Sequence, residues 1–229
     1  MRAIPREARR VTYSAKIRSL KKELKLNSFQ KSVVIGCILG DGYLEQNWSK
    51  TNYRLTIQHS IDQREYLFWK YNIFREWTLR EPKLILANNS IRFRTISHPE
   101  LTELWKKFYK DRKKVISENI ADYLDPVALA VWFMDDGNIV IRKNKAVGVH
   151  LNTQSFSWEE NNILADIFLK KYDIFCSIEK NKKRYRLAIW RNESRNKFIS
   201  IVKPYIVSSM YYKIGLICDS SSPVETSIC

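Results

Sequence analysis

Two segments of the chain share the pattern that most constrains its fold: an apolar, helix-like run that ends in an acidic residue and glycine. The first run, Val34–Gly42, reads VIGCILGDG, and the second, Leu129–Gly137, reads LAVWFMDDG. Helices that are apolar on nearly all sides are buried. Two of them, each opening one half of the chain, predict a duplicated fold in which Asp41 and Asp136 stand at matching helix ends.

Both helices have recognisable start signals. Asn27 or Ser28 can cap the free N–H groups of the first helix, with Gln30 in its first turn. Asp125 is suited to cap the second helix, and Pro126 is favoured at a first helical position. We therefore expect the helices to begin at these points.

The ends and the shared surface of the two helices can also be predicted. Gly42 and Gly137 follow the acids and are expected to end the helices in the left-handed conformation. Small residues would let the two helices approach closely and bring both aspartates to one seam, and these are Gly36, Gly40, Ala128 and Ala130.

Each run is followed by strand-like and helix-like segments in the same order. Hairpin or alternating patterns predict strands at 54–58, at 83–95 with a turn at Asn88-Asn89, at 139–151 with a turn near Lys143-Asn144, and at 174–190 with a turn around 181–183. Three- and four-residue spacing of apolar side chains predicts helices at 63–80, 100–109, 158–172 and 193–202. The repeated unit is helix, two strands, helix, two strands, helix, which is an α+β fold with pseudo-twofold symmetry. We expect an N-terminal arm (1–26), two halves (27–124 and 125–213) and a tail (214–229).

Composition points to a polyanionic partner. The chain of 229 residues carries 40 Lys and Arg against 24 Asp and Glu, a formal net charge of +16. Basic side chains are dense in the predicted strands and turns, which favours sheets that lie in a nucleic-acid groove over sheets that are merely solvated. These residues are Arg54, Arg92, Arg94, Lys143, Lys145, Lys180, Lys182, Arg184 and Arg186.

Other classes of protein fit the sequence poorly. The apolar runs are too short for a membrane span. The four cysteines form no C-x-x-C pair, which argues against a zinc site or a disulfide framework and favours a reducing compartment.

The basic arm has an apolar stripe at Ile17, Leu20 and Leu24. It is expected to pack on the body or contact a phosphate backbone, with a mitochondrial transit peptide as the alternative.

The two acids themselves point to a metal site. The C-terminal end of a helix carries partial negative charge, so a carboxylate such as Asp41 or Asp136 is unfavourable there. A divalent cation would offset the repulsion between the acids and the free carbonyls of the last turns. Carboxylate, carbonyl and water ligands suit Mg²⁺.

The motifs, and several segments beyond them, resemble one family. Residues 132–137 (WFMDDG), 151–156 (LNTQSF), 203–205 (KPY) and 210–213 (MYYK) are similar to the LAGLIDADG homing endonucleases, in the monomeric, two-motif, intron-encoded, I-SceI-like branch. The resemblance covers about residues 27–213. At the sixth motif position the chain has Leu39 and Met134 in place of an acid, and Asp135 is an extra carboxylate in the second copy.

The resemblance implies roles for particular residues. Asp41 and Asp136 would bind two or more Mg²⁺ ions, assisted by the carbonyls of Gly40 and Asp135. A lysine and an amide side chain from each half would lie near the scissile phosphates. These are Lys114 and Lys213, with Lys113 as an alternative to Lys114, and Gln58 and Gln154.

The family implies a monomer that hydrolyses both strands of double-stranded DNA at a long, asymmetric site. Two curved antiparallel sheets would track the major groove on either side of the cleaved bonds. An RNA maturase that assists splicing of its host intron is the alternative function, and a non-catalytic DNA-binding regulator is a third. A His-Asn-His cluster, a GIY/YIG pair and a G-x-x-x-x-G-K loop are missing from the sequence, which disfavours other nucleases and ATP use. A composition rich in Lys, Ile and Asn suggests an organellar genome, mitochondrial or plastid.

Overall fold

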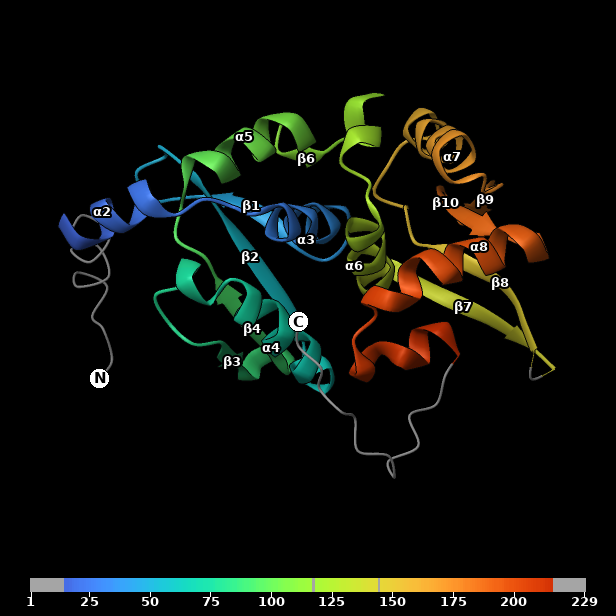
Figure 1. Ribbon diagram of the computed structural model, residues 1–229, viewed down its shortest axis with the longest axis horizontal. Coiled ribbons are helices and arrows are strands. Elements are labelled where there is room, and N and C mark those ends of the chain that lie inside the picture. Colours follow the sequence, from blue (N-terminus) through green and yellow to red (C-terminus); the bar gives the residue numbers. More distant parts are fainter. Residues whose placement is uncertain (1–14, 117, 144, 216–229) are drawn as a thin grey trace.

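The chain folds into two similar halves with a pair of helices between them. The computed structural model describes residues 15–116, 118–143 and 145–215, so most of the predicted arm and tail, and Asn144, lie outside the described residues. In Figure 1 the first half is blue to green, the second is yellow to red, and α3 and α6 lie between the two sheets. None of the helices in these ranges combines the length and apolar character that a membrane crossing requires.

The predicted order of elements is confirmed in both halves. The first half consists of α3 (Ser28–Leu39), β1 (Tyr43–Gln46), β2 (Tyr53–Ser60), α4 (Arg64–Ile73), β3 (Lys83–Ile85), β4 (Ser90–Arg94) and α5 (Pro99–Phe108). The second half consists of α6 (Pro126–Asp136), β7 (Gly137–Arg142), β8 (Lys145–Leu151), α7 (Trp158–Tyr172), β9 (Ser177–Asn181), β10 (Arg184–Ile189) and α8 (Asn192–Val202). The halves are joined by the short hairpin β5 (Tyr109–Lys110) and β6 (Lys113–Lys114) and by the turn η4 (Glu118–Asp122), while η5 (Lys203–Tyr205) and η6 (Ser208–Ile214) follow α8.

The starts of the two central helices follow their capping residues. The Asn27 side chain accepts a hydrogen bond from the backbone N–H of Gln30 at 2.7 Å, and the Gln30 side chain accepts one from the Asn27 N–H at 3.2 Å. Asp125 accepts from the Ala128 N–H at 2.8 Å, with Pro126 at the first helical position. Both predicted starts are therefore confirmed.

The predicted left-handed caps at Gly42 and Gly137 are wrong. Gly137 is extended, with φ −92° and ψ 160°, and Gly42 also has no positive φ. Glycine is required at both positions by close packing instead. A Cβ on Gly137 would stand 2.0 Å from Cδ2 of Phe133, and one on Gly42 would stand 2.7 Å from Cβ of Cys37.

Close packing also explains the small residues between α3 and α6. A Cβ on Gly36 would lie 2.6 Å from the Ala128 carbonyl oxygen, and one on Gly40 would lie 2.4 Å from Cβ of Asp135. Real side chains do not approach so closely, so only glycine permits this helix spacing. The prediction that small residues bring the two aspartates to one seam is confirmed at these positions.

Each half has a four-stranded antiparallel sheet, in the orders β1-β2-β4-β3 and β7-β8-β10-β9. Side chains alternate between the two faces of a strand. In β2, Leu55 and Ile57 are buried on one face, whereas Arg54 and Gln58 are only partly buried on the other. One face of each sheet therefore packs against the helices of its half, and the other carries polar side chains.

The helix predicted over 63–80 ends at Ile73 and gives way to the turn η2 (Arg75–Trp77). The chain is extended beyond the turn because Trp77 and Thr78 pair with the segment that follows β4, with the Ile96 N–H donating to the Trp77 carbonyl at 2.6 Å. The described part of the arm forms helix α2 (Ala15–Glu23), which buries Ile17 against the body as the apolar stripe predicts.

Candidate active site

The ends of α3 and α6 bring the predicted acids together. The backbone N–H of Asp41 donates to Oδ2 of Asp135 at 3.2 Å, so the end of one helix is fixed to the other. The Asp41 side chain is 42% exposed, and Asp136 is partly exposed. Both side chains can therefore be reached from outside, whereas the Asp135 carboxylate is fully buried.

The electrostatic environment separates the two exposed acids. Burial, together with the nearby charges of Asp41 and Asp135, raises the pKa of Asp136 to about 7. Burial also opposes ionisation of Asp41, but His59, Lys70 and Lys114 outweigh it and hold its pKa below the usual value. Repulsion between carboxylates at one seam is the condition that a divalent cation relieves.

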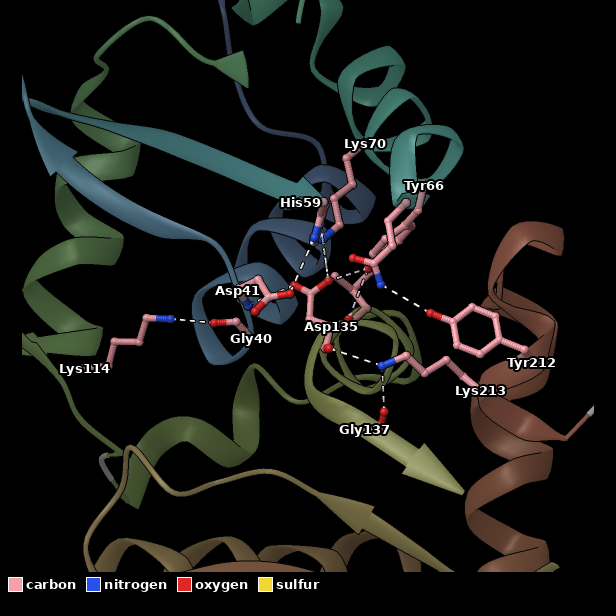
Figure 2. A network of polar contacts seen from close by, with 12 residues as sticks. Gly40, Asp41, His59, Tyr66, Lys70, Lys114, Asp135, Gly137, Tyr212 and Lys213 are labelled. Atoms are coloured by element: carbon pink, nitrogen blue, oxygen red, sulfur yellow. Dashed lines mark hydrogen bonds and ion pairs between the residues drawn. The ribbon is translucent and has the colours of Figure 1, made fainter. Parts of the chain in front are cut away.

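Two lysines occupy equivalent positions in the two halves (Figure 2). The Lys114 ammonium donates to the Gly40 carbonyl at 2.6 Å, and the Lys213 ammonium lies 3.4 Å from the Asp135 carbonyl and 2.8 Å from that of Gly137. Each lysine therefore contacts the carbonyl that directly precedes one exposed aspartate. Burial lowers the pKa of both lysines.

The hairpin β5–β6 distinguishes Lys114 from its neighbour. Lys114 is partly buried and reaches Gly40, whereas the adjacent Lys113 is exposed. Strand alternation sends the two side chains to opposite faces. The structure thus supports Lys114 over Lys113.

The donor atoms at the seam fit a hard divalent cation. Two partly exposed carboxylates, Asp41 and Asp136, lie beside the carbonyls of Gly40 and Asp135, and a carbonyl oxygen retains a second lone pair when a lysine donates to it. All of these donors are oxygen atoms, which suits Mg²⁺, Mn²⁺ or Ca²⁺ over softer ions.

A buried polar cluster beside Asp41 was not predicted from the sequence. Lys70 and Tyr66, both from α4, donate to Oδ1 of Asp135 at 2.6 Å and 2.8 Å (Figure 2). The His59 ring lies between Lys70 and Asp41. The sequence contains one signal for this cluster: Lys70 lies on the apolar stripe of its helix, one turn after Tyr66.

The strand register shows which residue of the second half corresponds to Gln58 of the first half. Tyr43, two residues after Asp41, pairs with Thr56, and Asn138, two residues after Asp136, pairs with His150. Gln58 therefore corresponds to the position two residues beyond His150, which is occupied by Asn152 and not by Gln154. The Asn152 N–H donates to the Asp136 carbonyl at 3.0 Å. Gln154 lies two residues further on and donates to the Asn152 side chain at 3.4 Å.

Most of the predicted basic residues lie on the uncovered sheet faces or in turns. Arg54 shares its face with Gln58, and Arg92 and Arg94 lie opposite Gln58 and Thr56 on β4. Arg184 and Arg186 alternate with the buried face of β10, while Lys143 and Lys182 lie in hairpin turns and Lys145 opens β8.

Lys180 differs from the other predicted basic residues. It pairs with Tyr185, whose ring packs against Trp158 of α7 with 5.0 Å between ring centroids. Paired residues point to the same face, so Lys180 belongs to the face that α7 covers. Lys180 therefore lies on the opposite face of the sheet from Arg184 and Arg186.

Glutamates hold some of these arginines in place. In the first sheet, Glu45 accepts from Arg54 at 2.9 Å and forms a 2.9 Å ion pair with Arg94. In the second sheet, Glu179 accepts two hydrogen bonds from Arg186, at 3.1 Å and 3.2 Å. The guanidinium groups are thereby fixed on the uncovered faces.

The comparisons with known proteins agree with this geometry. The model of the LAGLIDADG DNA endonuclease family matches residues 31–198. A probable intron-encoded endonuclease of Wickerhamomyces canadensis is 31% identical over 209 residues, which are 86% of this chain and 89% of that protein. The solved structure of the homing endonuclease I-WcaI bound to its DNA recognition sequence has a TM-score of 0.81 and 29% identity, and it covers 88% of this chain and 93% of that one.

A maturase also matches. The cytochrome b mRNA maturase bI2 of Saccharomyces cerevisiae is 28% identical over 209 residues, which are 83% of this chain but 48% of the maturase. The family model and the endonuclease relative each extend over most of the chain, and both motifs, 34–42 and 129–137, lie within the residues that the family model matches. The chain therefore belongs to the LAGLIDADG DNA endonuclease family, whose members hydrolyse DNA and use divalent metal ions.

Proposed function

We propose that this endonuclease cuts both strands of a long, asymmetric double-stranded DNA site as a monomer, with Mg²⁺ as its metal ion. The observation that carries the proposal is the duplication of the site within one chain. In each half a partly buried lysine contacts the carbonyl that precedes an exposed aspartate, Lys114 beside Asp41 and Lys213 beside Asp136. Two strands require two such half-sites.

The residues of each half-site have distinct roles in the proposal. Asp41 and Asp136, with the carbonyls of Gly40 and Asp135, would hold the metal ions. When bound, Mg²⁺ would supply Lewis-acid stabilisation of the phosphate and an activated water. Lys114 and Lys213 would neutralise developing negative charge, and their depressed pKa also suits them to exchange a proton with water.

The amide side chains would position solvent near the scissile phosphates. Gln58 is fixed by donating to the Ser90 hydroxyl at 2.8 Å. Asn152 occupies the matching position of the second half and contacts Gln154, which would assist from the adjacent position.

The uncovered faces of the two sheets would lie in the major groove on either side of the cleaved bonds. The two faces carry different side chains, with Arg94 in the first sheet at the register position that Ala188 occupies in the second. Unlike faces read unlike half-sites, which is why the target is expected to be asymmetric.

The experiment that tests the proposal is digestion of a randomised double-stranded DNA library with Mg²⁺, followed by sequencing of the cut ends, with Asp41→Asn as the control. One long asymmetric consensus that the control does not cut is the expected result. A folded protein that binds DNA but yields no enriched cut site would contradict the proposal.

The match to a cytochrome b mRNA maturase favours one second function, assistance in splicing the host intron, and an organellar origin of the gene. The test is binding and splicing of the intron RNA that carries the coding sequence, using the Asp136→Asn variant. Splicing by a protein that cannot cut DNA would show that this activity is separate.

A further inference from the structure

The cluster beside Asp41 places a buried ion pair, Lys70 with Asp135, next to a buried histidine. The side chains of Lys70 and Asp135 have no exposed surface, and that of His59 is 1% exposed. A buried ion pair contributes little net stability relative to apolar residues of similar size, because both charges lose their hydration. A role beyond folding is therefore expected for this cluster.

The ligand atoms of Asp41, His59 and Asp135 lie within 4.8 Å of one another, a spacing that could hold a metal ion. The Lys70 ammonium already contacts two of these residues, at 2.6 Å from Oδ1 of Asp135 and 3.0 Å from Nε2 of His59. The cation at the centre of the cluster is thus the Lys70 ammonium. The cluster contacts Asp41 from the buried side of that residue.

The hydrogen bonds in the cluster have a defined direction. An ammonium group only donates, so Lys70 donates to Nε2 of His59. A neutral imidazole that accepts at Nε2 carries its proton on Nδ1. That atom is buried and makes no hydrogen bond, and the Oδ2 atom of Asp41 lies 3.5 Å from it. The Nδ1 side of the His59 ring therefore faces the Asp41 carboxylate at ion-pair distance, without a formed hydrogen bond.

The side chain of Asp135 holds the backbone of Asp41 in place. It accepts from the Asp41 N–H at 3.2 Å, while Tyr66 and Lys70 hold its other oxygen. The extra acid of the second motif thus supports the end of the first motif helix, and both the backbone and the carboxylate of Asp41 are tied to the cluster.

The second half has a neutral arrangement at the matching place. Since Gln58 corresponds to Asn152, His59 corresponds to Thr153. The Thr153 hydroxyl donates to Asn161 at 2.5 Å and accepts from the Leu187 N–H at 3.1 Å. These contacts secure β8 and α7 within the half and do not extend to Asp136.

We propose that His59 is a positioning residue for the metal-binding carboxylate of Asp41, with Lys70 and Asp135 fixing its ring, and that this support belongs to the first half only. The inference rests on the proposed function, in which Asp41 holds a metal ion. It gives the two half-sites unequal affinities for the ion, because the buried cluster contacts Asp41, whereas the described contacts of Thr153 do not extend to Asp136.

Mn²⁺ binding to the protein alone tests the proposal, measured from the electron paramagnetic resonance signal of the free ion. His59→Leu removes the donor, and we expect Mn²⁺ affinity to fall ~10-fold or more, as for other partners of metal ligands. His59→Asn keeps an amide near the Nδ1 position, and its affinity should stay within ~3-fold of that of the unmodified protein. Thr153→Val is the matched control, because it loses a buried hydroxyl in the other half and should leave Mn²⁺ affinity unchanged.

Asp41→Asn distinguishes a wrong metal site from a wrong positioning role for His59. If this variant binds Mn²⁺ as well as the unmodified protein, the metal site of the proposed function is wrong. If Asp41→Asn weakens binding while folded His59→Leu does not, only the positioning role is overturned. If His59→Leu gives no cooperative thermal melt, the double variant Lys70→Met with Asp135→Asn replaces it, because it removes both buried charges together. Unchanged Mn²⁺ affinity in that variant would equally overturn the role.

Discussion

Among single residues, Asp41 and Asp136 differ from the other acids near the seam in being accessible from outside. Asp135 lies next to Asp136 in the chain, yet its carboxylate is buried and neutralised by Lys70. The distinction between an acid that can hold a metal ion and one that supports it is therefore made by burial and partners.

Replacement of either exposed aspartate by asparagine should abolish cleavage. Loss of an outer partner of a metal ligand alone costs ~10–100-fold, so loss of a direct ligand from Asp41→Asn or Asp136→Asn is expected to slow cleavage by more than ~100-fold. Binding to the target in Ca²⁺ should remain, because the sheets are untouched. Single-turnover cleavage and fluorescence anisotropy measure the two effects, and undiminished cutting by either variant would refute the metal assignment.

Removal of one buried ammonium should slow chemistry more than binding. We expect Lys114→Met or Lys213→Met to reduce the cleavage rate ~10²–10⁴-fold, the usual range for a group that transfers a proton or neutralises charge. Lys113→Met is the matched control, because it removes an exposed lysine from the same hairpin. Equal effects of Lys113→Met and Lys114→Met on the cleavage rate would show that general positive charge, and not the contact with Gly40, matters.

Among the elements, the two sheets share strand order but differ in the arginines that their glutamates fix. Glu45 holds Arg54 and Arg94 in the first sheet, and Glu179 holds Arg186 in the second. A fixed guanidinium fork is suited to paired hydrogen bonds with a guanine edge, whereas a mobile basic side chain suits a phosphate.

The sheets should therefore contain two kinds of basic residue. Arg94→Ala is expected to cost ~1–3 kcal/mol and to relax base preference at one target position. Arg184→Ala removes an exposed arginine and should weaken binding to all sequences about equally. Target libraries randomised one position at a time measure this difference. A base preference unchanged by Arg94→Ala would assign that arginine to the phosphate backbone.

For the whole molecule, the net charge of +16 is the property most relevant to DNA binding. A protein that contacts 6–10 phosphates loses ~10³–10⁵ in affinity between 50 and 200 mM salt, because bound counterions are released from the DNA. We expect a loss in this range, with a linear dependence of log affinity on log salt, in fluorescence anisotropy titrations. A shallow dependence would be incompatible with the two basic sheets as the DNA-binding surface.

Local sequence patterns predicted much of the fold. The capping residues Asn27 and Asp125, the apolar periodicity of α7 and the hairpin turn at Asn89 depend on side chains a few positions apart, and all are confirmed. The duplicated motif also predicted that Asp41 and Asp136 would meet at the ends of the two helices, whereas Lys114 and Lys213 were predicted from the family resemblance.

Contacts between distant segments could not be predicted in this way. The correspondence of Gln58 with Asn152 depends on the register of two hairpins, whose paired positions differ in spacing by one residue. Gln154, the glutamine nearest to the spacing of Gln58 from its motif, lies two residues beyond the matching position. The glycines after the acids are required by Phe133 and Cys37, not by their own backbone angles.

The sequence by itself determined the duplicated α+β plan, the paired acids and the basic character of the chain, because those follow from periodicity and composition. Only the tertiary structure decided that Lys70, His59 and Asp135 form one buried chain behind Asp41. These residues come from α4, β2 and α6, and they meet because the close packing of α3 on α6 brings the second motif against the helix and sheet of the first half.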